Sequence, residues 1–190
     1  MKAITFQGIE SLAYEDLPDP GLINSTDAII RVTVAGICGS DLHPYFGREQ
    51  GLDYGTVMGH ELLGEVVELG ADVQGFAVGD IGVAPFTTNC GHCFFCLSGL
   101  TARCETGQLF GWVEDGAGLH GAQAEFVRVP MADSTLVAVP DGLDEAVALL
   151  AGDILSTAAF GAELAGVQPG DLVVVVGCGP LGLLCVRAAL

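Results

Sequence analysis

The alternation of apolar and polar residues over the first 140 positions predicts short β-strands rather than helices. β-Branched and other apolar residues fill the runs, and Gly, Pro and Asp separate them. This pattern is typical of a turn-rich, β-barrel-like domain. One short helix is expected after Ser40. The expected strands are Lys2–Phe6, Ala28–Val34, Gly64–Leu69, Asp80–Ala84, Ala124–Val129 and Thr135–Val139.

The pattern changes at Asp141, after which Ala and Leu recur with helical spacing. A turn near Pro169 then leads to an apolar run that predicts a buried strand. The expected elements are helices over Leu143–Leu150 and Ile154–Ala165, a strand over Leu172–Val176, and a helix over Leu183–Leu190. We therefore place a domain boundary near residue 150 and predict mixed β and α/β structure.

Composition narrows the class of protein. The chain has 190 residues, of which 51% are hydrophobic and 16% charged, so it can bury a core and is not expected to be disordered. Its formal charge of -18 would repel nucleic acid and anionic membranes. We see no export signal and no apolar run long enough to span a membrane. We therefore expect a cytoplasmic protein without nucleic-acid or membrane partners.

Four of the seven cysteines lie in one lobe, residues 89–105, with the spacing C-x2-C-x2-C-x7-C. Thiolates with this spacing can close a tetrahedron around a structural Zn²⁺ ion. Two disulfides are the alternative, but they would need strained geometry and an oxidising compartment. His92 lies inside the lobe and is expected to be a solvated loop residue. The expected ligands are Cys90, Cys93, Cys96 and Cys104.

A second potential metal site involves residues at strand–loop junctions. Cys38 follows one expected strand, and His60 and Glu61 precede another; binding residues are often found in such positions. Taken alone, either Cys38 or His60 could equally belong to the core, because free cysteine is among the most buried residue types and a lone histidine is unremarkable.

Four segments together resemble the medium-chain zinc-dependent alcohol dehydrogenases, in the same order and at similar separations. They are Gly36–His43, Met58–Glu61, the cysteine lobe and Val174–Gly182, and the resemblance covers essentially the whole chain. It implies a GroES-like β domain that carries two zinc sites. It also implies a Rossmann domain that binds NAD or NADP, with the active site in the cleft between the two domains.

The resemblance also implies a catalytic zinc site. Cys38 and His60 would be ligands, with Asp153 as the third ligand at the start of the helix that crosses between the domains, as in bacterial secondary-alcohol dehydrogenases. Many relatives have cysteine at that position, and Asp153 could instead merely cap the helix. Glu61 would be an outer or transient fourth ligand. Thiolate, neutral imidazole and carboxylate together balance the charge of Zn²⁺, as two thiolates and one imidazole do.

The same resemblance suggests a proton relay and a substrate pocket. Ser40 would take the alcohol proton, the cofactor ribose would relay it, and His43 would pass it to solvent. Thr157 would lie beside the nicotinamide, and Phe86 and Trp112 would line the substrate pocket. Ser40 could instead be a turn or capping residue, and the two aromatic residues could belong to the core.

The segment Gly177–Gly182 fits the pattern G-x-G-x-x-G. Its residues, namely Gly177, Gly179, Pro180, Leu181 and Gly182, would bring the pyrophosphate of a dinucleotide to a helix N-terminus. The pattern alone is a weak signal, but here it follows an apolar run and opens an apolar helix. The residue that distinguishes NAD from NADP would lie about 20 residues further on, beyond Leu190.

A Rossmann domain has about six strands, and this chain would supply one. We therefore expect a GroES-like domain over 1–150 and the incomplete start of a Rossmann domain over 151–190. The predicted function is hydride transfer between an alcohol, aldehyde or ketone and NAD(P), by an enzyme that is homo-oligomeric when full length. The alternative is a catalytically inert zinc-binding module, although the open ligand set favours the enzyme.

Overall fold

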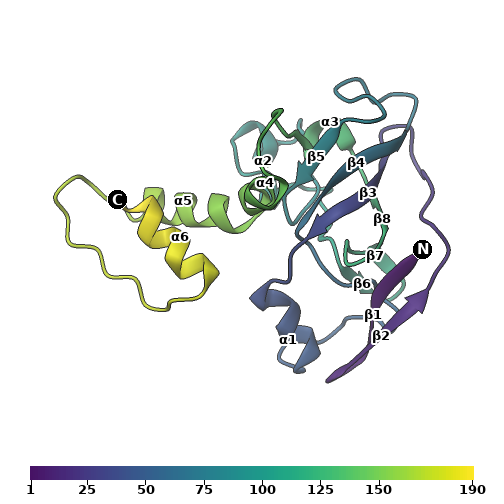
Figure 1. The fold of residues 1–190 in the computed structure, drawn as a ribbon, viewed down its shortest axis with the longest axis horizontal. Coiled ribbons are helices and arrows are strands. Elements are labelled where there is room, and N and C mark those ends of the chain that lie inside the picture. Colours follow the sequence, from purple (N-terminus) through teal and green to yellow (C-terminus); the bar gives the residue numbers. More distant parts are fainter.

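The computed structural model describes residues 1–190 (Figure 1). All of its strands lie before residue 139 and its three longest helices follow, which agrees with the change of pattern at Asp141. The strands are β1 (Lys2–Gly8), β2 (Ser11–Asp16), β3 (Ala28–Ala35), β4 (Leu62–Leu69), β5 (Ile81–Ala84), β6 (Trp112–Glu114), β7 (Ala117–Leu119), β8 (Phe126–Val129) and β9 (Val137–Ala138). The helices are η1 (Gly39–Asp41), α1 (Leu42–Tyr45), α2 (Phe94–Leu97), η2 (Thr101–Arg103), α3 (Ala132–Thr135), α4 (Glu145–Gly152), α5 (Ile154–Leu164) and α6 (Pro180–Ala188).

An antiparallel five-stranded sheet, in the order β8-β3-β4-β5-β9, forms the centre of the β domain. The hairpins β1–β2 and β6–β7 are separate two-stranded sheets, and the bridge between Thr5 and Val57 attaches β1 to the segment before β4. Within the sheet, Ala35 at the end of β3 pairs with Leu62 at the start of β4. The segments that follow β3 and precede β4 therefore leave the sheet at the same end.

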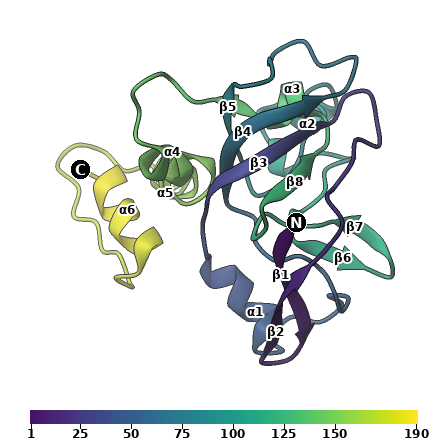
Figure 2. The same ribbon diagram turned by 45° about the vertical axis from the view of Figure 1, so that its right-hand side comes forward.

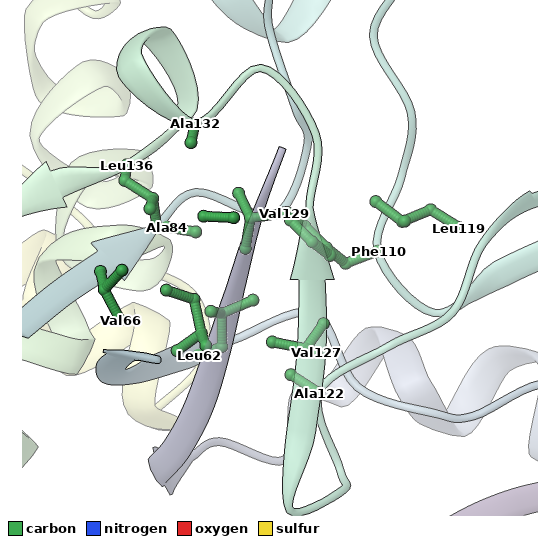
Figure 3. Packing of buried hydrophobic residues seen from close by; sticks show 12 residues of the cluster. Leu62, Val66, Ala84, Phe110, Leu119, Ala122, Val127, Val129, Ala132 and Leu136 are labelled. Carbon is green, nitrogen blue, oxygen red and sulfur yellow. The ribbon is translucent and has the colours of Figure 1, made fainter. Parts of the chain in front are cut away.

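Successive residues of β4 belong to two different cores, because side chains alternate between the two faces of a strand. Leu62 is buried in a cluster of 12 residues that fills the interior of the β domain (Figure 3). Leu63 is also buried, but it packs with Val83 against Ala148 and Leu149 of α4. This second cluster holds α4 against the outer face of the sheet.

The helices α5 and α6 lie to one side of the sheet, joined to it through α4 (Figures 1 and 2). The axes of α4 and α5 differ by 47°, and α6 packs along α5. No single helix is long and apolar enough to cross a membrane; the bent pair of α4 and α5 meets that test only when its two members are taken together.

The prediction of a buried strand over Leu172–Val176 is wrong. The segment has no regular secondary structure, and Leu172, Val174 and Val176 are 94%, 78% and 96% exposed. A strand forms only where a neighbouring strand can accept and donate its backbone hydrogen bonds, and no strand of this chain lies beside this segment. The apolar pattern therefore has no partner to pair with.

Several element boundaries also differ from the prediction. Helix α6 begins at Pro180 rather than Leu183, because Gly179 is its N-cap and proline suits the first helical position. The strand expected over Thr135–Val139 is shortened to β9, because α3 occupies the preceding residues, and the strand expected over Ala124–Val129 begins only at Phe126. The pattern did not indicate β2, nor β6, β7, α2, α3 and η2, which have three or four residues each and show no clear period.

Candidate metal centre and adjoining cavities

A tight turn after β3 positions Cys38. Gly36 and Ile37 lead out of the strand into η1. Asp41 closes the turn, because its Oδ2 accepts a hydrogen bond from the Cys38 N–H at 2.9 Å while its own N–H donates to the Cys38 carbonyl at 3.1 Å. Backbone hydrogen bonds therefore hold the thiol in place.

His60 reaches the same place from the segment before β4. The preceding residue, Gly59, has a φ of +92°, which residues with a Cβ rarely adopt, and a Cβ there would collide with Gln123. Nδ1 of His60 lies 3.1 Å from Oδ1 of Asp41. The Asp41 carboxylate thus contacts both the Cys38 backbone and the His60 ring, and this second role was not predicted from the sequence.

Asp153 approaches from a third direction, at the break between α4 and α5. Gly152 brings the end of α4 close to the backbone of Ala84, where a Cβ would lie 2.6 Å from the carbonyl oxygen. Oδ2 of Asp153 lies 3.5 Å from Nε2 of His60, and its Oδ1 accepts a hydrogen bond from the Thr157 hydroxyl at 3.3 Å. Asp153 occupies the N-cap position of α5, but its side chain makes no capping hydrogen bond there.

The structure brings Cys38, His60, Glu61 and Asp153 together, with one potential ligand atom of each within 4.8 Å of the others. Adjacent ligands of tetrahedral zinc lie about 3.3 to 3.8 Å apart, given zinc–ligand bonds of about 2.0 to 2.3 Å. The 3.5 Å separation of His60 and Asp153 agrees with that spacing. One sulfur, one imidazole nitrogen and carboxylate oxygens are donors that zinc accepts, so these residues fit a zinc ion.

The electrostatics of the cluster favour a positive charge. Burial lowers the pKa of His60, but hydrogen bonds with Asp153, Asp41 and Cys38 outweigh it and raise that pKa to about 12. Burial raises the pKa of Glu61, and the Asp153 carboxylate raises it further, although a hydrogen bond with Cys38 opposes the shift. Neighbouring acidic groups contribute to both shifts, and such crowding of acidic groups suits a divalent cation.

Two cavities adjoin this cluster and share Ser40, Asp153 and Thr157 as lining residues. The first has a volume of about 310 Å³ and the second about 620 Å³. The first is also lined by Asp41, Pro44, Glu49, Met58, His60, Phe86, Leu109, Phe110, Gly111 and Trp112. The second is also lined by Gly36, Ile37, Cys38, Gly39, His43, Glu61, Leu149, Leu150, Ile154, Gly179, Pro180 and Leu181.

The residues of the expected relay and substrate pocket lie along these cavities. The Ser40 hydroxyl is 3.6 Å from the Cys38 sulfur, and His43, in α1, lines only the second cavity. Phe86 and Trp112 are half-buried and line the first cavity, and neither belongs to a core cluster. Their placement therefore differs from that of core aromatic residues.

The glycine-rich segment faces the second cavity with three of its five expected binding residues, namely Gly179, Pro180 and Leu181. Gly177 and Gly182 do not line the cavity. Gly177 has a φ of +112°, and Gly182 packs so closely on the Gly177 carbonyl that a Cβ would overlap it. A tight turn and a close approach of helix to loop are the reasons for glycine at the ends of this motif.

The cysteine lobe forms the second cluster. Its four sulfur atoms lie within 4.8 Å of one another, with Cys90 and Cys96 at 3.9 Å, and none forms a disulfide. Backbone N–H groups of Cys90 and Cys93 donate to the sulfurs of Cys104 and Cys90 at 3.2 and 3.3 Å. Such hydrogen bonds stabilise thiolates, so the donor set fits a zinc ion as well.

The lobe thiols differ in their affinity for protons. Partial burial opposes deprotonation of Cys104, but hydrogen bonds from the Thr106 hydroxyl and the Cys90 backbone lower its pKa to about 6. Partial burial and the neighbouring Cys93 raise the pKa of Cys96 to about 11. The thiols of Cys96 and Cys104 therefore bind protons with different affinities, as expected of groups that crowd one small space.

The two remaining histidines outside the cluster and the relay have local contacts. His92 is exposed, and its Nδ1 lies 2.8 Å from the Cys90 carbonyl, as expected for a loop residue. Sequence reasoning assigned no role to His120. Its Nδ1 accepts a hydrogen bond from the Val57 N–H at 3.1 Å, which ties the end of β7 to the segment that leads to His60.

Comparisons with known proteins identify the family of the chain. Residues 24–141 match the family model of the alcohol dehydrogenase GroES-like domain. The chain is 43% identical to zinc-type alcohol dehydrogenase B of Aspergillus flavus, over 100% of this chain and 45% of that protein. It is 40% identical to the solved structure of alcohol dehydrogenase TADH from Thermus sp. ATN1, with a TM-score of 0.92 over 100% of this chain and 54% of that one.

A third comparison concerns a dinucleotide complex. The chain is 28% identical to a zinc-binding dehydrogenase of Sinorhizobium meliloti, solved with NADP, with a TM-score of 0.83 over 99% of this chain and 52% of that one. The chain thus spans about half the length of the relatives it matches.

Proposed function

Because the chain belongs to the zinc-type alcohol dehydrogenases with a GroES-like domain, we propose that it supplies the metal-binding part of a zinc-dependent oxidoreductase. The reaction is hydride transfer between an alcohol, or the corresponding aldehyde or ketone, and NAD(P). The observation that carries this proposal is the cluster of Cys38, His60 and Asp153 between two cavities. A zinc site that only stabilised the fold would not need a cavity on either side.

We assign the two zinc ions to different roles. Cys90, Cys93, Cys96 and Cys104 would hold one ion and stabilise the lobe, since four thiolates leave no open position. Cys38, His60 and Asp153 would hold the other, with Glu61 beside it, and this ion would supply Lewis acidity toward an alcohol or carbonyl oxygen.

The chain's own residues then account for orientation and proton movement. Asp41 orients the His60 ring through Nδ1, so that Nε2 faces Asp153 and the cluster. The Ser40 hydroxyl lies next to the Cys38 sulfur and lines both cavities, where it can accept the alcohol proton. His43 lines the second cavity and would pass that proton on to water.

The two cavities divide the ligands. Phe86 and Trp112 in the first offer an apolar wall for the carbon part of a small alcohol or aldehyde. Thr157, Gly179, Pro180 and Leu181 in the second would contact the dinucleotide, at the N-terminus of α6. We place the protein in the cytosol, where its seven free cysteines would stay reduced, as a homo-oligomer when full length.

Turnover by the protein carrying a complete dinucleotide-binding domain tests the function. Reduction of NAD or NADP should be measured by absorbance with a panel of primary and secondary alcohols, after zinc loading. We expect turnover with at least one alcohol and loss of turnover in Cys38→Ser. A properly folded, zinc-loaded protein that reduces neither dinucleotide with any alcohol would instead be an inert zinc-binding module.

A further inference from the structure

Glu49 contributes an unpaired carboxylate to the first cavity. Three acidic residues line that cavity, namely Asp41, Glu49 and Asp153. Asp41 and Asp153 each contact the His60 ring, at 3.1 and 3.5 Å, so both have a partner. No hydrogen bond or ion pair engages the carboxylate of Glu49. It is therefore the one acidic group of the cavity that remains free to bind a ligand.

The loop that carries Glu49 is anchored at both ends. On one side, the Arg48 N–H donates to the His43 carbonyl at 2.8 Å. On the other, the Asp53 N–H donates to the Val113 carbonyl at 2.8 Å, and the Asp53 carboxylate accepts from the Gly116 N–H at 2.8 Å. The loop is thus attached to α1 and to the β6–β7 hairpin, and Glu49 is held beside the cavity.

His60 already contacts Asp41 and Asp153, so no basic residue compensates Glu49 from within the cavity. No lysine or arginine lines it, and the neighbouring Arg48 lies over the Phe46 ring, 5.4 Å from its centroid. Apolar side chains, among them Met58, Phe86 and Leu109, also line the cavity. Its lining therefore combines the metal cluster, apolar side chains and one free negative charge.

This arrangement matches a particular class of alcohol. A hydroxyl would be placed at the metal cluster, a short carbon chain against the apolar side chains, and a positive group beside Glu49. Resting on the proposed function, we propose that Glu49 determines specificity, and that the site prefers small amino alcohols with an ammonium group at the far end. The volume of about 310 Å³ is at the small end for ligand pockets, which suits a short carbon chain. An anionic alcohol would meet an unpaired carboxylate and be disfavoured.

Binding can be measured without catalysis, because the only tryptophan of the chain, Trp112, lines the same cavity. Fluorescence of the zinc-loaded protein should be titrated with n-butanol, with the aminobutanol that carries its ammonium on the far carbon, and with γ-hydroxybutyrate. We expect the aminobutanol to bind most tightly and γ-hydroxybutyrate most weakly. Because Glu49 is exposed, the Kd should rise by roughly two- to fivefold from the aminobutanol to n-butanol, and again to γ-hydroxybutyrate. These differences in Kd should become smaller with added salt.

Two variants separate a local effect from the general charge of the protein. Glu49→Gln should bring the Kd values of the aminobutanol and n-butanol together. Glu68→Gln removes the same charge from an exposed position on β4, six residues or about 20 Å along the strand from Leu62, and should leave their ratio unchanged. The inference would be overturned if Glu49→Gln left the ratio of the two Kd values unchanged, or if the three ligands bound without the expected order of affinity. Either result would leave the proposed function standing. No saturable binding of any of the three ligands would also overturn the inference, while turnover with the alcohol panel would still decide the proposed function.

Discussion

Nδ1 of His60 lies 3.1 Å from Oδ1 of Asp41, and both side chains are buried. The other oxygen of the same carboxylate accepts hydrogen bonds from the Cys38 N–H at 2.9 Å and from Gln123 Nε2 at 3.2 Å. One carboxylate therefore fixes the orientation of two expected zinc ligands that lie 22 residues apart in the sequence.

We expect Asp41→Asn to weaken zinc binding at the open site by about 10- to 100-fold, the usual effect of losing a group that orients a ligand. Competition with a chelator measures this affinity. The zinc of the cysteine lobe serves as the internal control, and its affinity should not change. Equal weakening of both sites would indicate a general loss of folding rather than a role at His60.

Metal analysis should find two zinc ions per chain, because the two ligand clusters are separate and chemically different. Cys93→Ser should remove the ion of the lobe, and Cys38→Ser the ion of the open site, so each variant should retain one. A parent protein with one zinc, which is lost completely in Cys93→Ser, would show that the open cluster does not hold a metal.

Asp153→Asn should abolish turnover in the protein with a complete dinucleotide-binding domain, while circular dichroism stays unchanged. The substitution removes a charged ligand but keeps the size of the side chain. Asp144→Asn is the matched control, because the Asp144 side chain does cap a helix, accepting from the Val147 N–H at 3.1 Å, and asparagine caps as well as aspartate. Full activity of Asp153→Asn would exclude it as a ligand.

Ser40→Ala should reduce alcohol oxidation more than His43→Gln does, because Ser40 adjoins the cluster and His43 lies further along the second cavity. General acid–base groups contribute about 10²- to 10⁴-fold. We expect the Ser40 loss within that range and the His43 loss at or below its lower end, mainly below neutral pH. The rate of alcohol oxidation between pH 5.5 and 9, measured together with the zinc content of each variant, tests this order. A larger loss for His43→Gln, or loss of a zinc ion, contradicts the relay.

His120 should make the fold less stable at acid pH. Burial lowers the pKa of His120, and the positive charge of Arg128 lowers it further. The unfolded chain therefore binds a proton more readily, so this contribution to stability is present at neutral pH and is lost as pH falls through about 6.5.

The test of this effect is urea unfolding of the parent protein and of His120→Asn, which retains an acceptor for the Val57 N–H. Between pH 7.5 and 5.5 the unfolding free energy of the parent should fall more than that of the variant. The difference should be well below the roughly 1.4 kcal/mol of one full pKa unit, because the ring is partly exposed. The two proteins have the same carboxylates, so their carboxylates should contribute equally to the change with pH. An equal fall of the unfolding free energy in both proteins would therefore contradict the prediction.

Much of this protein follows from local sequence. The spacing of Cys90, Cys93, Cys96 and Cys104 indicates a metal lobe because ligands so close in the chain can converge whatever surrounds them. The strands β3 and β4 follow from alternation and apolar content, since each has eight residues and is long enough to show a pattern. The placement of Cys38, His60 and Asp153 followed from resemblance, and alone their residue types would also have suited a core or a helix cap.

Only the tertiary structure decided which distant groups meet. The pairing of Ala35 with Leu62 brings Asp41 to His60, and the anchored loop before Asp53 brings Glu49 to the first cavity; neither contact leaves a periodic signal in the sequence. The reverse holds at Leu172–Val176, where the pattern of a buried strand is present without the strand. Side-chain patterns report local preference, but backbone pairing and contacts between distant segments depend on partners that the local sequence does not specify.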